Sequence, residues 1–173
     1  FLFLFRNKIF LKEIPGERPN VFEKNRMVKE MQLSSEMVNL IERAIMDRRF
    51  SSYSTHFLSL FSMKNIRPSD HIINRVCEYA LQDKLSSESI RSLFIYIQQF
   101  NLKGYCEFFR KIIEMLIQKE DYMAGVISPI VAEMECFNCY ETIKKVVNGK
   151  DRNPIAIDEA KEALEILDKK RKK

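Results

Sequence analysis

The stretch that decides the fold is residues 60–77, which read LFSMKNIRPSDHIINRVC. Its two ends carry apolar residues at helical spacing, and the segment Arg-Pro-Ser-Asp at 67–70 lies between them. Proline cannot donate a backbone hydrogen bond, and it disfavours a helical conformation in the residue before it. The stretch therefore predicts the end of one helix, a tight turn and the start of a second helix.

Similar helix ends and turns recur along the chain about every 35 residues. Three pairs of matching segments show this period: Asn39 and Asn74, residues 50–52 and 85–87, and residues 65–66 and 101–102, with separations of 35, 35 and 36 residues. A period of this length with two helices per unit is typical of stacked helical hairpins, in which each unit buries its apolar face against its neighbours.

The chain after residue 33 is predicted to form four such pairs of helices. Ser34 or Ser35 suits the N-cap of the first helix, and Gly104 suits a turn that needs a positive φ. Asn153 followed by Pro154 suits the start of the last helix. In the first pair, one helix is expected to start at Ser34 and the next to begin after residue 52 and end before Pro68. The other three pairs are expected over residues 70–82 and 87–99, 105–119 and 121–133, and 138–148 and 155–170.

The composition also favours helices. Apolar residues make up 46% of the chain, so the chain is not disordered, and its four glycines and five prolines are too few for a β protein of strands and turns. We expect an all-α fold, a stack of about four antiparallel helical hairpins (an α-solenoid) over residues 34–173. One packed layer of this stack is expected to contain Ile73, Val76, Leu93 and Phe94.

Residues 1–33 lack the helical period and are predicted to be an irregular apolar arm followed by a connector. An apolar arm is unfavourable in water, so we expect it to pack on the first hairpin or on a partner chain. The chain does not begin with Met, which suggests a fragment or a processed product of a longer protein. The aromatic residues of the arm expected to contact a partner are Phe1, Phe3, Phe5 and Phe10.

Residues 66–77, IRPSDHIINRVC, resemble the boundary between units of the pentatricopeptide repeat family and, less specifically, of its tetratricopeptide relatives. The unit of that family is a helical hairpin of about 35 residues. Its typical boundary reads Gly-Ile-x-Pro-Asp, then a spacer, then Asn and an apolar pair. The resemblance covers about residues 36–149. The chain departs from the pattern where Asn65 replaces a glycine and where Gly104 replaces the proline.

The resemblance implies a site for single-stranded RNA. In this family, bases are read by the early-helix Asn position and by the last residue of the repeat. Those positions correspond to Asn74 with Ser69 and, more loosely, to Asn39. Arg110 stands where the next unit would carry its Asn, which breaks a continuous RNA code.

Charge favours a protein partner over RNA. Of the 29 basic side chains, five belong to residues 169–173, so the remaining 168 residues hold 24 basic and 24 acidic groups. A nucleic-acid platform usually shows a basic face, and this composition does not favour one. The tail also resembles a nuclear-localisation cluster, and we expect it to be exposed and dispensable for folding. It comprises Lys169, Lys170, Arg171, Lys172 and Lys173.

Four aromatic residues around position 100 have two interpretations. Near Lys103, Arg110 and Lys111, they resemble a platform on which bases stack. Apolar residues at helical spacing more often belong to the core, and we favour that interpretation. The four residues are Tyr96, Tyr105, Phe108 and Phe109.

The cysteines and histidines do not form a recognisable catalytic or metal motif. Cys136 and Cys139 have the spacing of half a zinc site, but no second pair follows, and His56 and His71 are far apart. All four cysteines lie within apolar helical patterns, so we expect small buried thiols in a reducing intracellular compartment, the nucleus or cytoplasm rather than the mitochondrion. We expect no bound metal, no cofactor, no small-molecule substrate and no membrane span.

The sequence therefore predicts a non-catalytic helical-repeat scaffold rather than an enzyme. Its expected partner is another protein in a larger complex, or the remainder of a longer chain. The alternative is a single-stranded RNA-binding module of pentatricopeptide type.

Overall fold

The computed structural model describes residues 33–102, 104–149 and 153–172. These residues belong to a unit that spans residues 33–173, and the account below concerns this unit alone. The expected apolar arm, with Phe1, Phe3, Phe5 and Phe10, lies outside the described residues. Within the described ranges the regular structure is helical and contains no strand, so the all-α prediction is confirmed.

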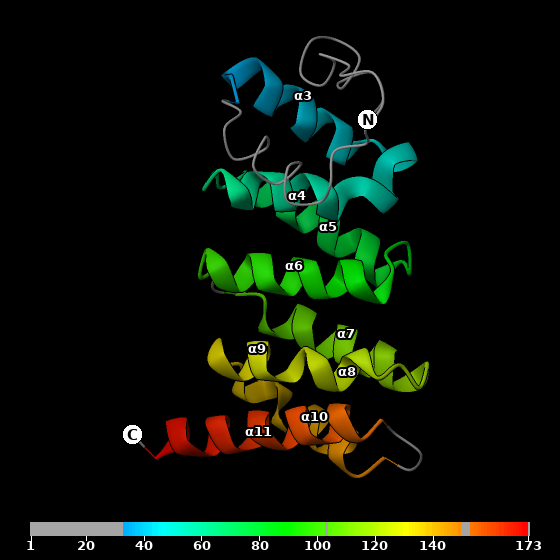
Figure 1. The fold of residues 1–173 in the computed structure, drawn as a ribbon, viewed down its shortest axis with the longest axis vertical. Coiled ribbons are helices and arrows are strands. Elements are labelled where there is room, and N and C mark those ends of the chain that lie inside the picture. Colours follow the sequence, from blue (N-terminus) through cyan, green and yellow to red (C-terminus); the bar gives the residue numbers. More distant parts are fainter. Residues whose placement is uncertain (1–32, 103, 150–152, 173) are drawn as a thin grey trace, which may run out of the picture. The chain divides into compact units, whose positions relative to one another are not determined.

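The helices follow the order seen along the colour ramp of Figure 1. Their bounds are α3 (Ser35–Met46), α4 (Ser54–Met63), α5 (Asp70–Leu81), α6 (Ser87–Gln99), α7 (Cys106–Gln118), α8 (Met123–Val126), α9 (Ser128–Glu133), α10 (Tyr140–Val147) and α11 (Pro154–Arg171), with 3-10 segments η1 (Arg48–Tyr53) and η2 (Phe137–Cys139).

Several predicted helix starts and ends are confirmed. The Ser34 side chain caps α3 by accepting a hydrogen bond from the Met37 backbone N–H, and Asn153 caps α11 by accepting one from the N–H of Ile155. Gly104 has a φ of 96°. These features follow from local chemistry, because each cap involves side chains and amides within three residues.

The helix predicted over residues 121–133 is divided in two. It separates at Ile127 into α8 and α9, with Pro129 at the second position of α9. Proline lacks an N–H and clashes with the carbonyl four residues earlier, so a continuous helix cannot pass through this position without distortion. The sequence prediction was wrong here because it placed Pro129 inside one helix.

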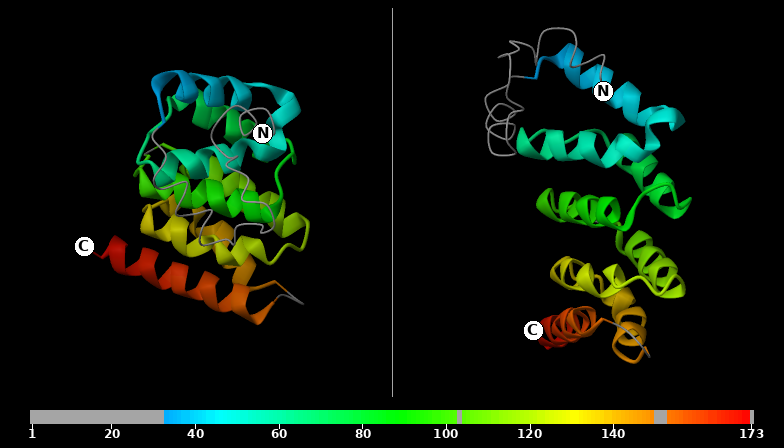
Figure 2. Two further views of the ribbon diagram at one scale, coloured as in Figure 1. Left: turned by 45° about the horizontal axis from the view of Figure 1, so that its top comes forward. Right: turned by 45° about the vertical axis from the view of Figure 1, so that its right-hand side comes forward.

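Helices pack mainly against the second helix along the chain, and this produces two rows. In the first row α3 packs on α5, α5 on α7 and α7 on α10. In the second row α4 packs on α6, α6 on α8 and α9, and both of these on α11. Figures 1 and 2 show the second row running down the fold beside the first. We call these the first-helix row and the second-helix row.

Among the described residues, five helices end with the same backbone motif. After each, one residue takes a left-handed conformation, and the next N–H reaches back to a carbonyl five residues earlier. Ile66 donates to Phe61 at 2.8 Å and Lys84 to Tyr79 at 2.9 Å. The motif satisfies helix-end carbonyls and turns the chain back. The left-handed residues, with φ between 46° and 60°, are Asn65, Asp83, Asn101, Glu120 and Glu135.

Polar contacts within a row join residues 34 and 36 positions apart in two examples. The Tyr79 hydroxyl on α5 donates to the carbonyl of Ile45 at 3.0 Å, at the end of α3. Lys119 at the end of α7 pairs with Asp83 at the end of α5. Such contacts fix the register in which one helix lies on the next.

The core lies between the rows. Ile73, Val76, Leu93 and Phe94 are all fully buried, as predicted. The centre of the Phe94 ring on α6 lies 4.4 Å from the centre of the Phe109 ring on α7, so this contact joins the two rows. No helix in the described ranges is both long and apolar enough to cross a membrane.

Candidate functional site

The residues singled out for RNA recognition lie on consecutive helices of the first-helix row. Asn39 is on α3, Asn74 is on α5, and Arg110 is on α7, while Ser69 directly precedes α5. Asn39, Ser69 and Asn74 are exposed, and Arg110 is half-buried. Packing of α3 on α5 and of α5 on α7 therefore brings one such residue from each helix to the same row.

The Asn74 amide already has an intramolecular partner. Its Oδ1 accepts a hydrogen bond from the Tyr105 hydroxyl at 3.0 Å. Burial is the main cause that raises the pKa of Tyr105 to about 12, so its hydroxyl remains a donor at neutral pH. An RNA base that used the same amide oxygen would have to share it with Tyr105.

The positive charge of Arg110 is compensated by two carboxylates on its own helix. Arg110 pairs with Glu107 at 2.6 Å and with Glu114 at 2.7 Å. The hydrogen bond from Arg110 lowers the pKa of the Glu107 carboxyl. On α5, Arg75 pairs in the same way with Glu78 at 2.6 Å. A phosphate would have to displace these partners, so Arg75 and Arg110 offer little uncompensated charge to a nucleic-acid backbone.

Most of the aromatic set near residue 100 belongs to the core. Tyr96, Phe108 and Phe109 are buried, and only Tyr105 is half-buried. Lys103 lies outside the described residues. The stacking-platform interpretation is therefore wrong for the buried rings, because the helical period of α7 turns Phe108 and Phe109 towards Phe94.

The cysteines differ from the expected four thiols. Cys106 and Cys136 form a disulfide that links the start of α7 to the segment after α9. Cys77 and Cys139 are free and buried, and burial raises the pKa of the Cys139 thiol to about 12. The spacing of the cysteines did not single out this pair, because Cys77 lies 29 residues before Cys106 and Cys139 lies 33 residues after it. The compartment stays a prediction.

Within the described residues, no group of three or more His, Cys, Asp or Glu side chains is arranged to hold a metal ion. One cavity of about 250 Å³ between α4 and α6 is rich in hydroxyl groups. Those of Ser59 and Ser92 donate to backbone carbonyls of their own helices, so they are already used in the fold. The cavity is lined by Thr55, His56, Ser59, Ser86, Glu88, Ser89 and Ser92.

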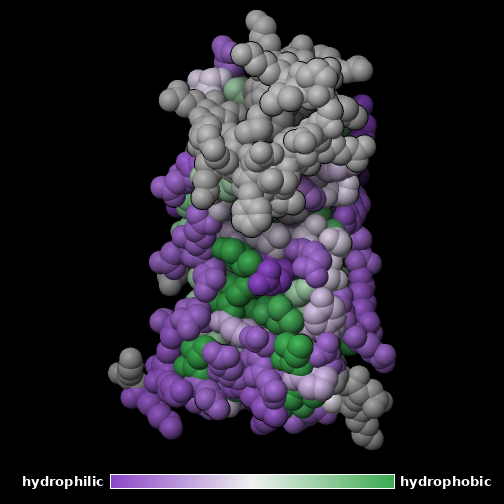
Figure 3. All heavy atoms as spheres, in the orientation of Figure 1, coloured by the Kyte–Doolittle hydropathy of each residue, from purple (hydrophilic) through white to green (hydrophobic). Residues whose placement is uncertain are grey.

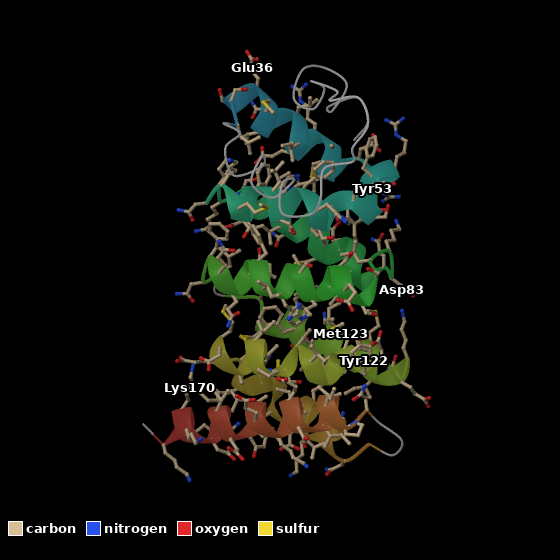
Figure 4. The ribbon with its side chains drawn as sticks, viewed as in Figure 1. Glu36, Tyr53, Asp83, Tyr122, Met123 and Lys170 are labelled. Atoms are coloured by element: carbon tan, nitrogen blue, oxygen red, sulfur yellow. A yellow bond between two sulfur atoms is a disulfide. The ribbon has the colours of Figure 1, made fainter. Side chains whose placement is uncertain are left out.

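The basic tail is not the free segment that we expected. Lys169, Lys170 and Arg171 form the last turn of α11. Lys170 donates to the Glu133 carbonyl at 2.9 Å and pairs with the Glu135 carboxylate at 3.6 Å. Figure 4 labels Lys170 at the end of α11 that faces α9. The expectation of an exposed tail is therefore wrong at Lys170, because α11 extends far enough to reach the carbonyl end of α9.

Arg171 is also engaged. Its guanidinium carbon lies 4.6 Å from the ring centre of Tyr140 and 5.6 Å from that of Phe137, distances typical of cation–π contacts. Lys172 is exposed, and Lys173 lies outside the described residues. The nuclear-localisation role of this segment stays a prediction.

Sequence reasoning missed the outer surface of the second-helix row. There Ile95 on α6 is 37% exposed and Tyr122 at the start of α8 is 46% exposed. Ile130 on α9 and Ile166 on α11 are half-buried. Figure 3 shows apolar side chains gathered over α6, α8 and α9. The signal in the sequence was the separation of the three isoleucines, which is 35 and 36 residues.

Comparison with known proteins does not add a relative. No protein-family model matches the chain, and no curated protein and no solved structure matches it either. The resemblance to pentatricopeptide units therefore rests on the residues of this chain alone.

Proposed function

We propose that residues 33–173 form a non-catalytic α-solenoid of antiparallel helical hairpins whose role is to hold a protein partner. Its two-row packing supports this proposal, because each helix lies on the second helix along the chain. The near-repeat separations of the polar contacts within each row support it as well, from Tyr79 to Ile45 and from Tyr122 to Glu88. Stacked hairpins create extended surfaces that suit binding rather than catalysis.

One observation carries the choice of a protein partner. Large apolar side chains are exposed on both rows, with Ile95, Tyr122 and Ile155 on the second-helix row and Leu40 and Leu81 on the first. On the first-helix row, Arg75 and Arg110 pair with carboxylates of their own helices. Apolar side chains gathered on a surface mark contacts with other proteins, whereas nucleic acid requires uncompensated positive charge.

The experiment is co-purification of the full chain with and without nuclease treatment. We expect the partner to remain bound after nuclease digestion, because the proposed contact is between proteins. Loss of every partner on digestion would contradict the proposal and favour RNA. The control is a variant of the chain in which Ser replaces Ile95, Ile130 and Ile166. Circular dichroism must first show that this variant retains its helices.

Single-stranded RNA remains the second candidate because Asn39, Asn74 and Arg110 lie on consecutive helices of one row. If this module binds RNA, Asn74→Ala should change the preferred base at one position with only a modest loss of affinity. Binding of a randomised single-stranded RNA pool at moderate salt is the measurement. Absence of binding would exclude the candidate.

A further inference from the structure

We propose that the free thiol of Cys139 exchanges with the Cys106–Cys136 disulfide, so that the protein exists in two covalent forms. In the form described above, the disulfide ties the start of α7 to the segment after α9. In the second form, a Cys136–Cys139 disulfide closes the turn at η2 and leaves Cys106 as a thiol, so that α7 is no longer tied to that segment. This inference concerns the chemistry of the fold and does not depend on the proposed scaffold function.

Three of the four cysteines gather at one point of the fold. The Sγ atom of Cys139 lies 3.4 Å from the carbonyl oxygen of Cys106, so its thiol is held against the residue that carries one end of the disulfide. Cys139 is also only three residues from Cys136, which carries the other end. Cys139 is fully buried there, and it has no disulfide partner of its own. The packing therefore places a free thiol next to both cysteines of the disulfide.

The backbone turn at residues 136–139 suits the second disulfide. The Cys139 N–H donates a hydrogen bond to the Cys136 carbonyl at 2.9 Å, which closes a turn of four residues. Such a turn places the Cα atoms of its first and fourth residues less than about 7 Å apart, and disulfides join Cα atoms that are about 4.4–6.8 Å apart. The second disulfide therefore forms without unfolding of this turn.

The exchange balances without an external oxidant or reductant. The Cys139 thiol loses its proton, and its sulfur attacks the Sγ atom of Cys136. The bond between Cys136 and Cys106 breaks, and its electron pair leaves with the Cys106 sulfur, which takes up a proton. One S–S bond forms as another breaks, as in every thiol–disulfide exchange. The two forms therefore have the same mass and differ only in which cysteine is free.

Cys106 is the better leaving group of the two disulfide cysteines. It is the first residue of α7 and is half-buried, whereas Cys136 is 1% exposed. The positive end of a helix dipole stabilises a thiolate, and partial exposure lets water solvate it. A thiol of lower pKa leaves faster. Attack on Cys136 with release of Cys106 is therefore favoured over the reverse choice.

Burial of Cys139 makes the exchange slow at neutral pH. Burial raises the pKa of its thiol to about 12, while Arg110 opposes this rise and Glu107 and Glu114 add to it. The attacking thiolate is therefore scarce at pH 7, although a thiolate of high pKa is the stronger nucleophile. Below the pKa, the thiolate fraction rises about tenfold with each pH unit, and the rate of exchange should rise with it.

The test traps the released Cys106 thiol with iodoacetamide in the folded full chain, without a reducing agent. Enough reagent is used that more does not raise the rate, so that exchange is the slow step. Digestion with pepsin at acid pH then stops further exchange, because thiols are protonated there, and mass spectrometry of the unreduced peptides locates the disulfide. We expect alkylated Cys106 together with a Cys136–Cys139 disulfide, formed about ten times faster at pH 8 than at pH 7.

Two variants separate the exchange from other routes to a free Cys106. Cys139→Ser should abolish alkylation of Cys106, because it removes the attacking thiol. Cys77→Ser removes the other free thiol, is the matched control and should leave the rate unchanged. Alkylation of Cys106 at an undiminished rate in Cys139→Ser would overturn the inference. If that variant does not fold, the original chain still decides the matter, because an intact Cys106–Cys136 disulfide at both pH values would overturn the inference as well.

Discussion

The two rows of helices share one core but differ on their outer faces. The first-helix row presents polar and charged residues such as Asn74 and Lys144 beside the exposed Leu40 and Leu81, and its Arg75 and Arg110 pair with glutamates of the same helix. The second-helix row presents Ile95 and Tyr122. Packing constrains the inward face of every helix, whereas it leaves the outward face free to differ. Function is therefore best sought in the outward faces.

The comparison also separates two kinds of stabilising contact. Between the rows, the buried contacts are mainly apolar, as between Phe94 and Phe109, and polar ones such as the Tyr140–Asp168 hydrogen bond lie at the end of the stack. Within a row, hydrogen bonds and ion pairs add to the packing, as between Tyr79 and Ile45 or Lys170 and Glu133. Apolar burial contributes most of the free energy, and the polar contacts select one register of each helix on the next.

The largest expected effect concerns the shared core. Phe94→Ala should lower the free energy of unfolding by about 3–5 kcal/mol, because it leaves a cavity between the rows next to Phe109. Ile95→Ala, at the next position but on the outer face, should cost less than about 1 kcal/mol. Urea denaturation of both variants checks the difference, and similar losses would contradict the separation of core and outer face.

The second prediction concerns the close packing of α8 on α11 within the second-helix row. A Cβ at Gly125 would lie 2.1 Å from the backbone oxygen of Ala156, so Gly125→Ala should destabilise the protein by about 1–3 kcal/mol. At Gly104 a Cβ would meet no atom within 4 Å, although φ is 96°. Gly104→Ala should therefore cost only about 1 kcal/mol through backbone strain. Thermal unfolding of both variants is the test, and the reverse order would contradict it.

The third prediction concerns the polar contacts of the first-helix row. Tyr79→Phe removes the buried donor to the Ile45 and Met46 carbonyls and should cost about 1–2 kcal/mol. Tyr122→Phe in the second-helix row removes an exposed hydroxyl bonded to Glu88 and should cost about 0.5 kcal/mol or less. Chemical denaturation compares them, and an equal loss would mean that burial of the hydroxyl does not matter.

The smallest effect is expected at the end of α11. Lys170→Ala removes the bond to the Glu133 carbonyl and should lower stability by about 0.5–1 kcal/mol, because this side chain is only 26% exposed. The side chain of Lys169 is 77% exposed, and Lys169→Ala should have an effect within about 0.3 kcal/mol. The measurement is the midpoint of thermal unfolding, and equal midpoints would support the exposed tail first expected from sequence.

By itself, the sequence determined most helix bounds and several of their caps. The starts at Ser87 and Pro154 and the turn at Gly104 depend on side chains and amides within one helical turn, so the local pattern was sufficient to predict them. A spacing of about 35 residues between similar helix ends was also visible in the sequence. The division of α8 from α9 was missed although Pro129 is its local cause.

Only the tertiary structure decided which residues of neighbouring helices in the same row contact each other. The Cys106–Cys136 disulfide, the hydrogen bond of Tyr79 to Ile45 and the contact of Lys170 with Glu133 all join residues 30 to 37 positions apart. A shift of one residue in the register between two helices turns each side chain by about 100° and would replace every one of these partners. Local patterns do not contain that register, because it is set by the combined packing of whole helix faces.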